Sequence, residues 1–127
     1  MTELLIENGA NVMVQDKDGL TPLHWASSQC HVDVVRLLIE HGANMAVQDK
    51  DWLTPLHWAS SRGHVGMVWL LIEHGANVTA QDELGSTPLH VASPQGHEDV
   101  AWLLIEHGAN VAVQDVSAAL RFLFQET

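Results

Sequence analysis

The feature that most constrains the fold of this chain is an internal repeat with a period of 33 residues. The stretch TPLHWASS occupies residues 21–28 and recurs unchanged at 54–61, and TPLHVASP follows at 87–94. A second phrase, LLIEHGAN, recurs three times in the same phase. Self-similarity at a fixed period of this length is the signature of a stacked array, in which each unit packs on its neighbours.

The phase of the repeat divides the chain into units of one continuous domain, 1–127. The short helices of one unit cannot bury their apolar residues alone, so each unit depends on the next for its core. The truncated start suggests a fragment of a longer array or a short isoform. We expect a partial N-terminal repeat at 1–11, full repeats at 12–44, 45–77 and 78–110, and an incomplete C-terminal capping unit at 111–127.

Each unit has the sequence signals of two helices. Thr21 is a good N-cap and Pro22 suits the first helical position, so we expect a helix that reaches about Ser28. A second helix is predicted from Val32 to His41. A glycine follows each second helix, where a left-handed C-terminal cap favours it. The buried face of the second helix is expected to contain Val35, Leu38 and Ile39.

The segments before the first helices have the short polar side chains of an extended β-hairpin, which Asp18 and Gly19 close in the first unit. Trp52 occupies the hairpin position that holds Gly19 and Gly85 in the other units. The turn asks for a positive φ there, so a bulky residue costs about 1 kcal/mol. Trp52 is either an aromatic anchor for a partner or a neutral substitution in a tolerant turn.

The other tryptophans fall in the helices. Trp25 and Trp58 belong to the first helices and are expected in the core. Trp69 and Trp102 align with Arg36, off the buried face of the second helix. Their indoles either lie flat over neighbouring second helices or form a second contact surface, such as that of a homodimer.

One proline departs from the repeat. Pro94 aligns with Ser28 and Ser61 near the end of the first helix. Proline removes a backbone N–H and disfavours helical geometry in the preceding residue. We therefore predict that the first helix ends early in the third unit.

Together these motifs resemble the ankyrin repeat family. The stretch DGLTPLHWASSQCHVDVVRLLIEHGAN at 18–44 carries the Thr-Pro-Leu-His helix start and the Leu-Leu-x-x-x-Gly-Ala end of an ankyrin repeat. The resemblance covers residues 1 to about 115. It implies an all-α solenoid of stacked helix-turn-helix units with projecting β-hairpin loops. It also implies a concave face of hairpins and first helices that binds proteins.

By this resemblance, the variable positions on the concave face contact the partner. The middle unit has the strongest binding character because it carries Lys50, Trp52 and Arg62, which would suit an acidic segment with an apolar side chain. The expected partner-binding residues are Lys17, Asp18, Leu20, Gln48, Lys50, Asp51, Trp52, Leu53, Arg62, Glu83, Leu84, Ser86 and Gln95.

The nine histidines form three sets with one member per unit, which argues against a metal site because metal ligands must converge on one point. No nucleophile lies beside a plausible base, so we expect no catalysis, no cofactor and no metal. An enzyme or metal-binding protein remains the rival interpretation. The sets are His24, His57 and His90, with an expected internal hydrogen bond; His31, His64 and His97; and His41, His74 and His107 at helix C-termini.

Charge and composition exclude some classes of binding partner. A formal charge of −11 repels phosphate backbones and anionic lipid heads, so nucleic acid and membranes are not expected partners. The longest apolar run, residues 67–72, is too short to span a bilayer. The single cysteine, Cys30, favours an intracellular location, cytoplasmic or nuclear.

We therefore expect a non-catalytic protein–protein interaction module. One alternative is a structural protein that self-associates as a dimer or by end stacking. Another is a fragment that serves as a spacer or as the recognition part of a larger protein.

Overall fold

The computed structural model describes residues 14–108, apart from the side chain of Gln95. The expected terminal units at 1–11 and 111–127 lie outside the described residues. Within 14–108 the helices pair in three successive units. These are α2 (Pro22–Ser28) with α3 (Val32–Glu40), α4 (Pro55–Ser61) with α5 (Val65–Glu73), and α6 (Pro88–Ala92) with α7 (Glu98–Glu106).

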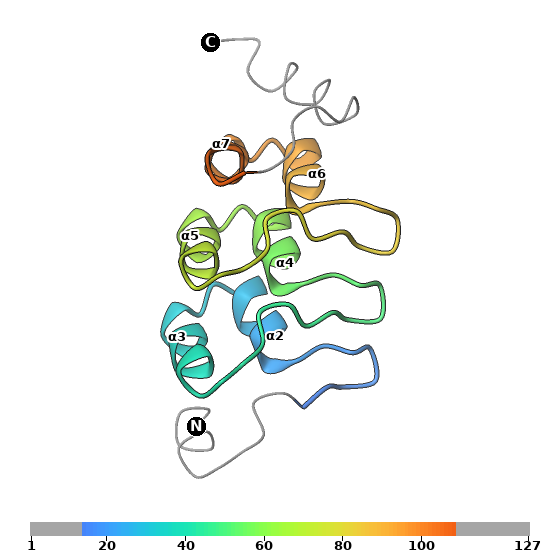
Figure 1. Ribbon diagram of the computed structural model, residues 1–127, viewed down its shortest axis with the longest axis vertical. Coiled ribbons are helices and arrows are strands. Elements are labelled where there is room, and N and C mark those ends of the chain that lie inside the picture. The colour runs from blue at the N-terminus through green and yellow to red at the C-terminus, as the bar shows by residue number, and fades with distance from the viewer. Residues whose placement is uncertain (1–13, 109–127) are drawn as a thin grey trace.

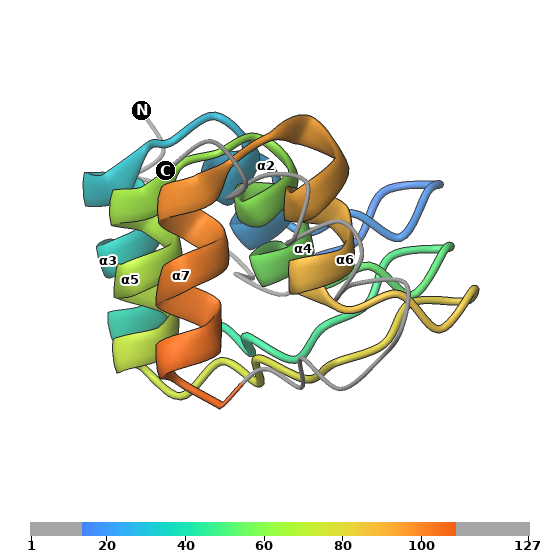
Figure 2. The same ribbon diagram turned by 90° about the horizontal axis from the view of Figure 1, so that it is seen from above.

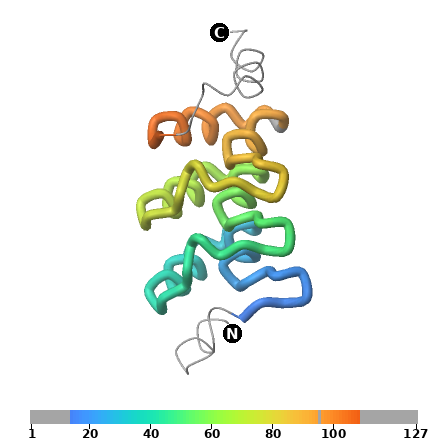
Figure 3. The backbone as a smooth tube through the Cα atoms, turned by 45° about the vertical axis from the view of Figure 1, so that its right-hand side comes forward, coloured from blue at the N-terminus to red at the C-terminus, as the bar shows by residue number. Residues whose placement is uncertain are grey.

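The three units stack along the long axis of the molecule (Figure 1). Seen from above, α2, α4 and α6 form one column and α3, α5 and α7 form a second column beside it (Figure 2). The loops that precede the first helices project from the far side of the first column and follow one another along the stack (Figure 3). This arrangement confirms the expected stack of helix-turn-helix units.

The first helices begin where the sequence predicts, because a capping box closes each N-terminus. In the first unit, the Thr21 hydroxyl accepts a hydrogen bond from the His24 backbone N–H at 3.4 Å. The His24 Nδ1 atom in turn accepts from the Thr21 backbone N–H at 3.1 Å. The same reciprocal pair recurs at Thr54 and Thr87. Two N–H groups that the helix cannot pair are thereby satisfied at each start.

The core runs through the middle of the stack, between the two columns of helices. Val35 and Leu38 of α3 are fully buried, as predicted, whereas Ile39 is only partly buried because it lies at the edge of the packed face. Burial of a leucine or valine side chain contributes about 1.5–3 kcal/mol. The fully buried side chains of the other helices include Leu23, Leu56, Met67, Val68, Leu71, Leu89, Val100 and Leu104.

The first helix of the third unit ends early, as predicted from Pro94. The α-helical part of α6 stops at Ala92, and a short 3₁₀ helix, η1 (Ser93–Gln95), replaces the last turn. The equivalent helices α2 and α4 continue to Ser28 and Ser61. Loss of the Pro94 backbone N–H explains the change from α to 3₁₀ geometry.

The loops form tight turns, and the expected β-hairpin strands are not found within residues 14–108. In the first loop, the Asp16 Oδ1 atom accepts hydrogen bonds from the backbone N–H groups of Asp18, at 2.8 Å, and Leu20, at 3.0 Å. These N–H groups are therefore not available for a ladder between strands. Neighbouring loops are joined by a backbone bond from the Lys50 N–H to the Asp18 carbonyl at 2.9 Å.

Candidate protein-binding face

Buried histidines tie the first helices α2 and α4 to the loop of the next unit. The His24 Nε2 atom lies 2.8 Å from the Leu53 carbonyl oxygen, and the His57 Nε2 atom lies 2.9 Å from the Ser86 carbonyl oxygen. Since Nδ1 accepts from a backbone N–H in both residues, Nε2 carries the proton and donates. Burial lowers the pKa of both imidazoles below the usual value of 6.5. The expected internal hydrogen bonds are thus confirmed for these two histidines.

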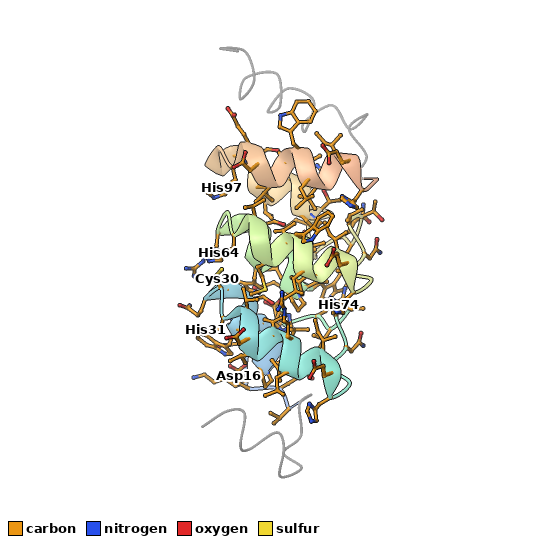
Figure 4. The ribbon with its side chains drawn as sticks, turned by 90° about the vertical axis from the view of Figure 1, so that its left-hand side faces the viewer. Asp16, Cys30, His31, His64, His74 and His97 are labelled. Atoms are coloured by element: carbon orange, nitrogen blue, oxygen red, sulfur yellow. The ribbon has the colours of Figure 1, made fainter. Side chains whose placement is uncertain are left out.

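A second set of histidines lies close to carbonyl groups of the preceding unit, whereas His24 and His57 bond to the next unit. The His64 Nε2 atom lies 3.0 Å from the Ser28 carbonyl oxygen, and the His97 Nε2 atom lies 3.1 Å from the Ser61 carbonyl oxygen. His31, His64 and His97 follow one another along one edge of the stack (Figure 4). Within residues 14–108, no three histidine, cysteine, aspartate or glutamate residues are placed to hold a metal ion.

The third set of histidines closes the C-termini of the second helices. In each unit the Nδ1 atom lies 2.9 Å from the carbonyl oxygen four residues earlier in the same helix. Each of these carbonyls also accepts the backbone N–H of the same histidine, so the imidazole adds a second hydrogen bond at the end of the helix. The residues are His41, His74 and His107.

A pocket of about 150 Å³ opens between the first helices α2 and α4. The sequence does not predict this pocket, because the pattern places Trp25 and Trp58 in the core. In the structure Trp25 is 54% exposed and Trp58 is partly exposed. The Trp58 indole Nε1 donates to the Asp49 Oδ2 atom at 3.1 Å, so the ring is held toward the loop and not between the helices. The lining residues are Leu20, His24, Trp25, Ser28, Trp58 and Arg62.

The tips of the loops carry two exposed apolar side chains. Trp52 is 52% exposed and Leu84, on the next loop, is 90% exposed. Trp52 has a φ of 67°, close to the 79° of Gly19 and 83° of Gly85 at the equivalent positions. The predicted positive φ is therefore confirmed, and the strain that it stores is of order 1 kcal/mol.

The three residues that gave the middle unit its expected binding character do not meet in one pocket. Arg62 lines the pocket between the first helices, beside Trp58. Lys50 lies on the loop, where its Nζ atom is 3.3 Å from the Asp18 carboxylate. The Asp18 carboxylate raises the pKa of Lys50 and offsets its charge.

The remaining expected contact residues lie along the loops and the adjoining helix starts. The side chain of Gln95 is outside the described part of the chain. Lys17, Gln48, Asp51 and Glu83 are exposed, and Leu20, Leu53 and Ser86 are partly exposed.

A second aromatic surface lies on the column of second helices, away from the loops. Trp69 of α5 is 44% exposed and Trp102 of α7 is 51% exposed. The Trp69 ring meets the His107 ring of the next unit with a centroid distance of 5.4 Å and an interplanar angle of 75°. This edge-on contact differs from the flat covering that was one of the two interpretations, and it leaves almost half of the Trp69 indole in solvent.

The chain was compared with known proteins. A family model described as ankyrin repeats in three copies matches residues 1–82 and 44–115. The search of curated proteins found no match. In the part of the chain that the structure describes, every helix is too short to cross a bilayer.

Proposed function

The chain belongs to the ankyrin repeat family, and on that premise we propose that it binds a partner protein through the face formed by its loops and first helices. Ankyrin repeats are generally protein–protein interaction modules. The proposal includes no catalytic step and no cofactor. An intracellular location is part of the same proposal, supported by an exposed free thiol at Cys30.

The observation that carries the proposal is the collection of exposed aromatic and cationic side chains on this face. Trp25 and Trp52 are each more than half exposed, and Arg62 lies beside Trp58 at the pocket. Tryptophan and arginine are enriched among the residues that dominate binding energy at protein interfaces. Exposed apolar side chains that gather on one surface mark interaction sites more often than scattered ones do.

The repeat itself supplies matched substitutions for a test. Trp52→Gly installs the residue of positions 19 and 85, and Trp58→Val installs the residue of position 91. Trp69→Arg, on the opposite surface, installs the residue of position 36. Each variant therefore carries a side chain that the same fold already accommodates elsewhere.

We would select binders from a library of displayed cDNA fragments, purify them, and titrate each against the wild type and the three variants. We expect Trp58→Val or Trp52→Gly to weaken binding at least tenfold, about 1.4 kcal/mol or more, and Trp69→Arg to change it little. Binding that only Trp69→Arg weakens would place the interface on the second helices. If Trp52→Gly alone has no effect, Trp52 is not an anchor.

Self-association is a second candidate function, favoured by the exposed indoles of Trp69 and Trp102. A homodimer through this surface would bury both rings. Light-scattering mass should then rise with concentration above the 13.9 kDa of the monomer. Trp69→Arg should restore the monomer, and a constant monomeric mass in the wild type would exclude this candidate.

A further inference from the structure

The pocket between α2 and α4 has the size of one side chain. Its volume is about 150 Å³, and an engineered apolar cavity of about this volume binds benzene. The walls include Leu20 and the indoles of Trp25 and Trp58. His24, at the base, is neutral and donates its Nε2–H to the Leu53 carbonyl. The pocket therefore favours an apolar, ring-sized group.

The Trp58 indole is held in place before any ligand binds. Asp49 is 7% exposed, and its Oδ1 atom accepts from the backbone N–H groups of Asp51 and Leu53 while its Oδ2 atom accepts from the Trp58 indole. A ligand that enters the pocket thus meets a Trp58 ring whose conformational freedom is already reduced, which lowers the entropic cost of binding.

Arg62 is the charged side chain among the residues that line the pocket. Arg62 is exposed at the rim of the pocket. It forms no salt bridge within residues 14–108; the salt bridge found in that range joins Lys50 to Asp18. The Asp49 carboxylate is not among the lining residues, and its oxygens accept three hydrogen bonds. The guanidinium beside the pocket therefore favours a carboxylate over a cation in the ligand.

We propose that this pocket binds an acidic peptide segment of a partner protein, with one phenylalanine side chain between Trp25 and Trp58 and a neighbouring carboxylate on Arg62. This inference rests on the proposed function. A phenyl ring is favoured over an aliphatic side chain because aromatic pairs gain stabilisation beyond their buried area. The overall charge of −11 opposes the approach of an acidic segment only weakly, since charges are screened over about 8 Å at physiological ionic strength.

The test begins with selection of a random peptide library displayed on phage against the full chain. We expect the enriched peptides to share a phenylalanine next to aspartate or glutamate. Enrichment of basic peptides, of peptides without an aromatic residue, or of no peptide would overturn the inference. In each of these cases the separate titration of cDNA-encoded fragments still decides whether the face binds proteins.

An enriched peptide is then synthesised and its Kd measured by fluorescence anisotropy. Arg62→Gln, which installs the residue of positions 29 and 95, should raise the Kd about tenfold, and Trp58→Val should raise it at least tenfold. Trp69→Arg is the control and should leave the Kd within about twofold. A Kd that depends on Trp58 but not on Arg62 would overturn the inference that the ligand is acidic, while the proposed binding face would stand. A Kd that none of these variants changes would overturn the inference, and the titration of cDNA-encoded fragments would still decide the proposed function.

Discussion

The buried histidines make the stability of the stack depend on pH. His24 and His57 are each 1% exposed, and Nδ1 of each ring accepts a backbone N–H. A protonated imidazole has no acceptor, so protonation breaks the capping box. Because the folded-state pKa lies below the usual 6.5, the unfolded chain takes up these protons first. Stability is therefore complete above pH 6.5 and is lost as the pH falls toward the folded-state pKa.

The size of the effect follows from the number of protons. Below pH 6.5 each histidine that is charged in the unfolded state and neutral in the folded state contributes about 1.4 kcal/mol per pH unit. For His24 and His57 together, the free energy of unfolding should fall by up to about 3 kcal/mol between pH 7.5 and pH 5.5. A typical domain has a free energy of unfolding of about 5–15 kcal/mol, so a loss of this size is measurable.

Urea unfolding followed by far-UV circular dichroism at pH 7.5, 6.5 and 5.5 provides the assay. His57→Gln should lower the stability at pH 7.5 and reduce the pH dependence by about half, because one of the two linked protons is removed. His31→Gln is the matched control, since the His31 ring is exposed. A free energy of unfolding that stays constant down to pH 5.5, or a wild-type slope in His57→Gln, would refute the reasoning.

Three further changes test the local geometry of the stack by urea or thermal unfolding. Cys30→Gly should raise the free energy of unfolding by about 0.5–1 kcal/mol, because Cys30 has a φ of 60° where the other units carry glycine; an unchanged or lower value would mean that the turn is not strained. Gly63→Ala should lower it by about 1–3 kcal/mol, since the added Cβ would lie 2.6 Å from the His97 Nδ1 atom at a φ of +72°; a neutral result would show that the ring moves aside freely. Pro94→Ser should extend the α-helix to position 94, with more helical circular dichroism and a gain of about 1 kcal/mol, and an unchanged spectrum would point to a cause other than the missing N–H.

Most of the helical framework could be predicted because its signals are local in sequence. Thr21 and Pro22 predict the start of α2, and the structure begins that helix at Pro22. The early end of α6 follows from Pro94 alone. The positive φ of Trp52 follows from comparison with Gly19 and Gly85. In each case the deciding atoms belong to the backbone of one short segment.

The binding pocket could not be predicted in the same way. A helix of seven residues such as α2 makes only about two turns, so periodicity does not fix which side chains face the core. The bond that turns Trp58 outward comes from Asp49, a loop residue nine positions earlier. The missing hairpin strands have a similar cause, because the Asp16 carboxylate takes the N–H groups that a strand would use.

The hydrogen bonds that His24, His57, His64 and His97 form between units also allow the number of repeats to change. Each link joins an imidazole of one unit to a main-chain carbonyl of its neighbour, and a carbonyl is present whatever side chain the residue carries. Loss of residues 29–61 by unequal recombination between the two identical TPLHWASS segments would bring His24 to the Ser86 carbonyl and His97 to the Ser28 carbonyl. The histidine hydrogen bonds between units would be preserved. Trp25 would however face Val91 in place of Trp58, so the pocket would lose one of its indole walls. Such a chain can change its number of units without inventing a new interface, while its binding specificity changes with every unit gained or lost.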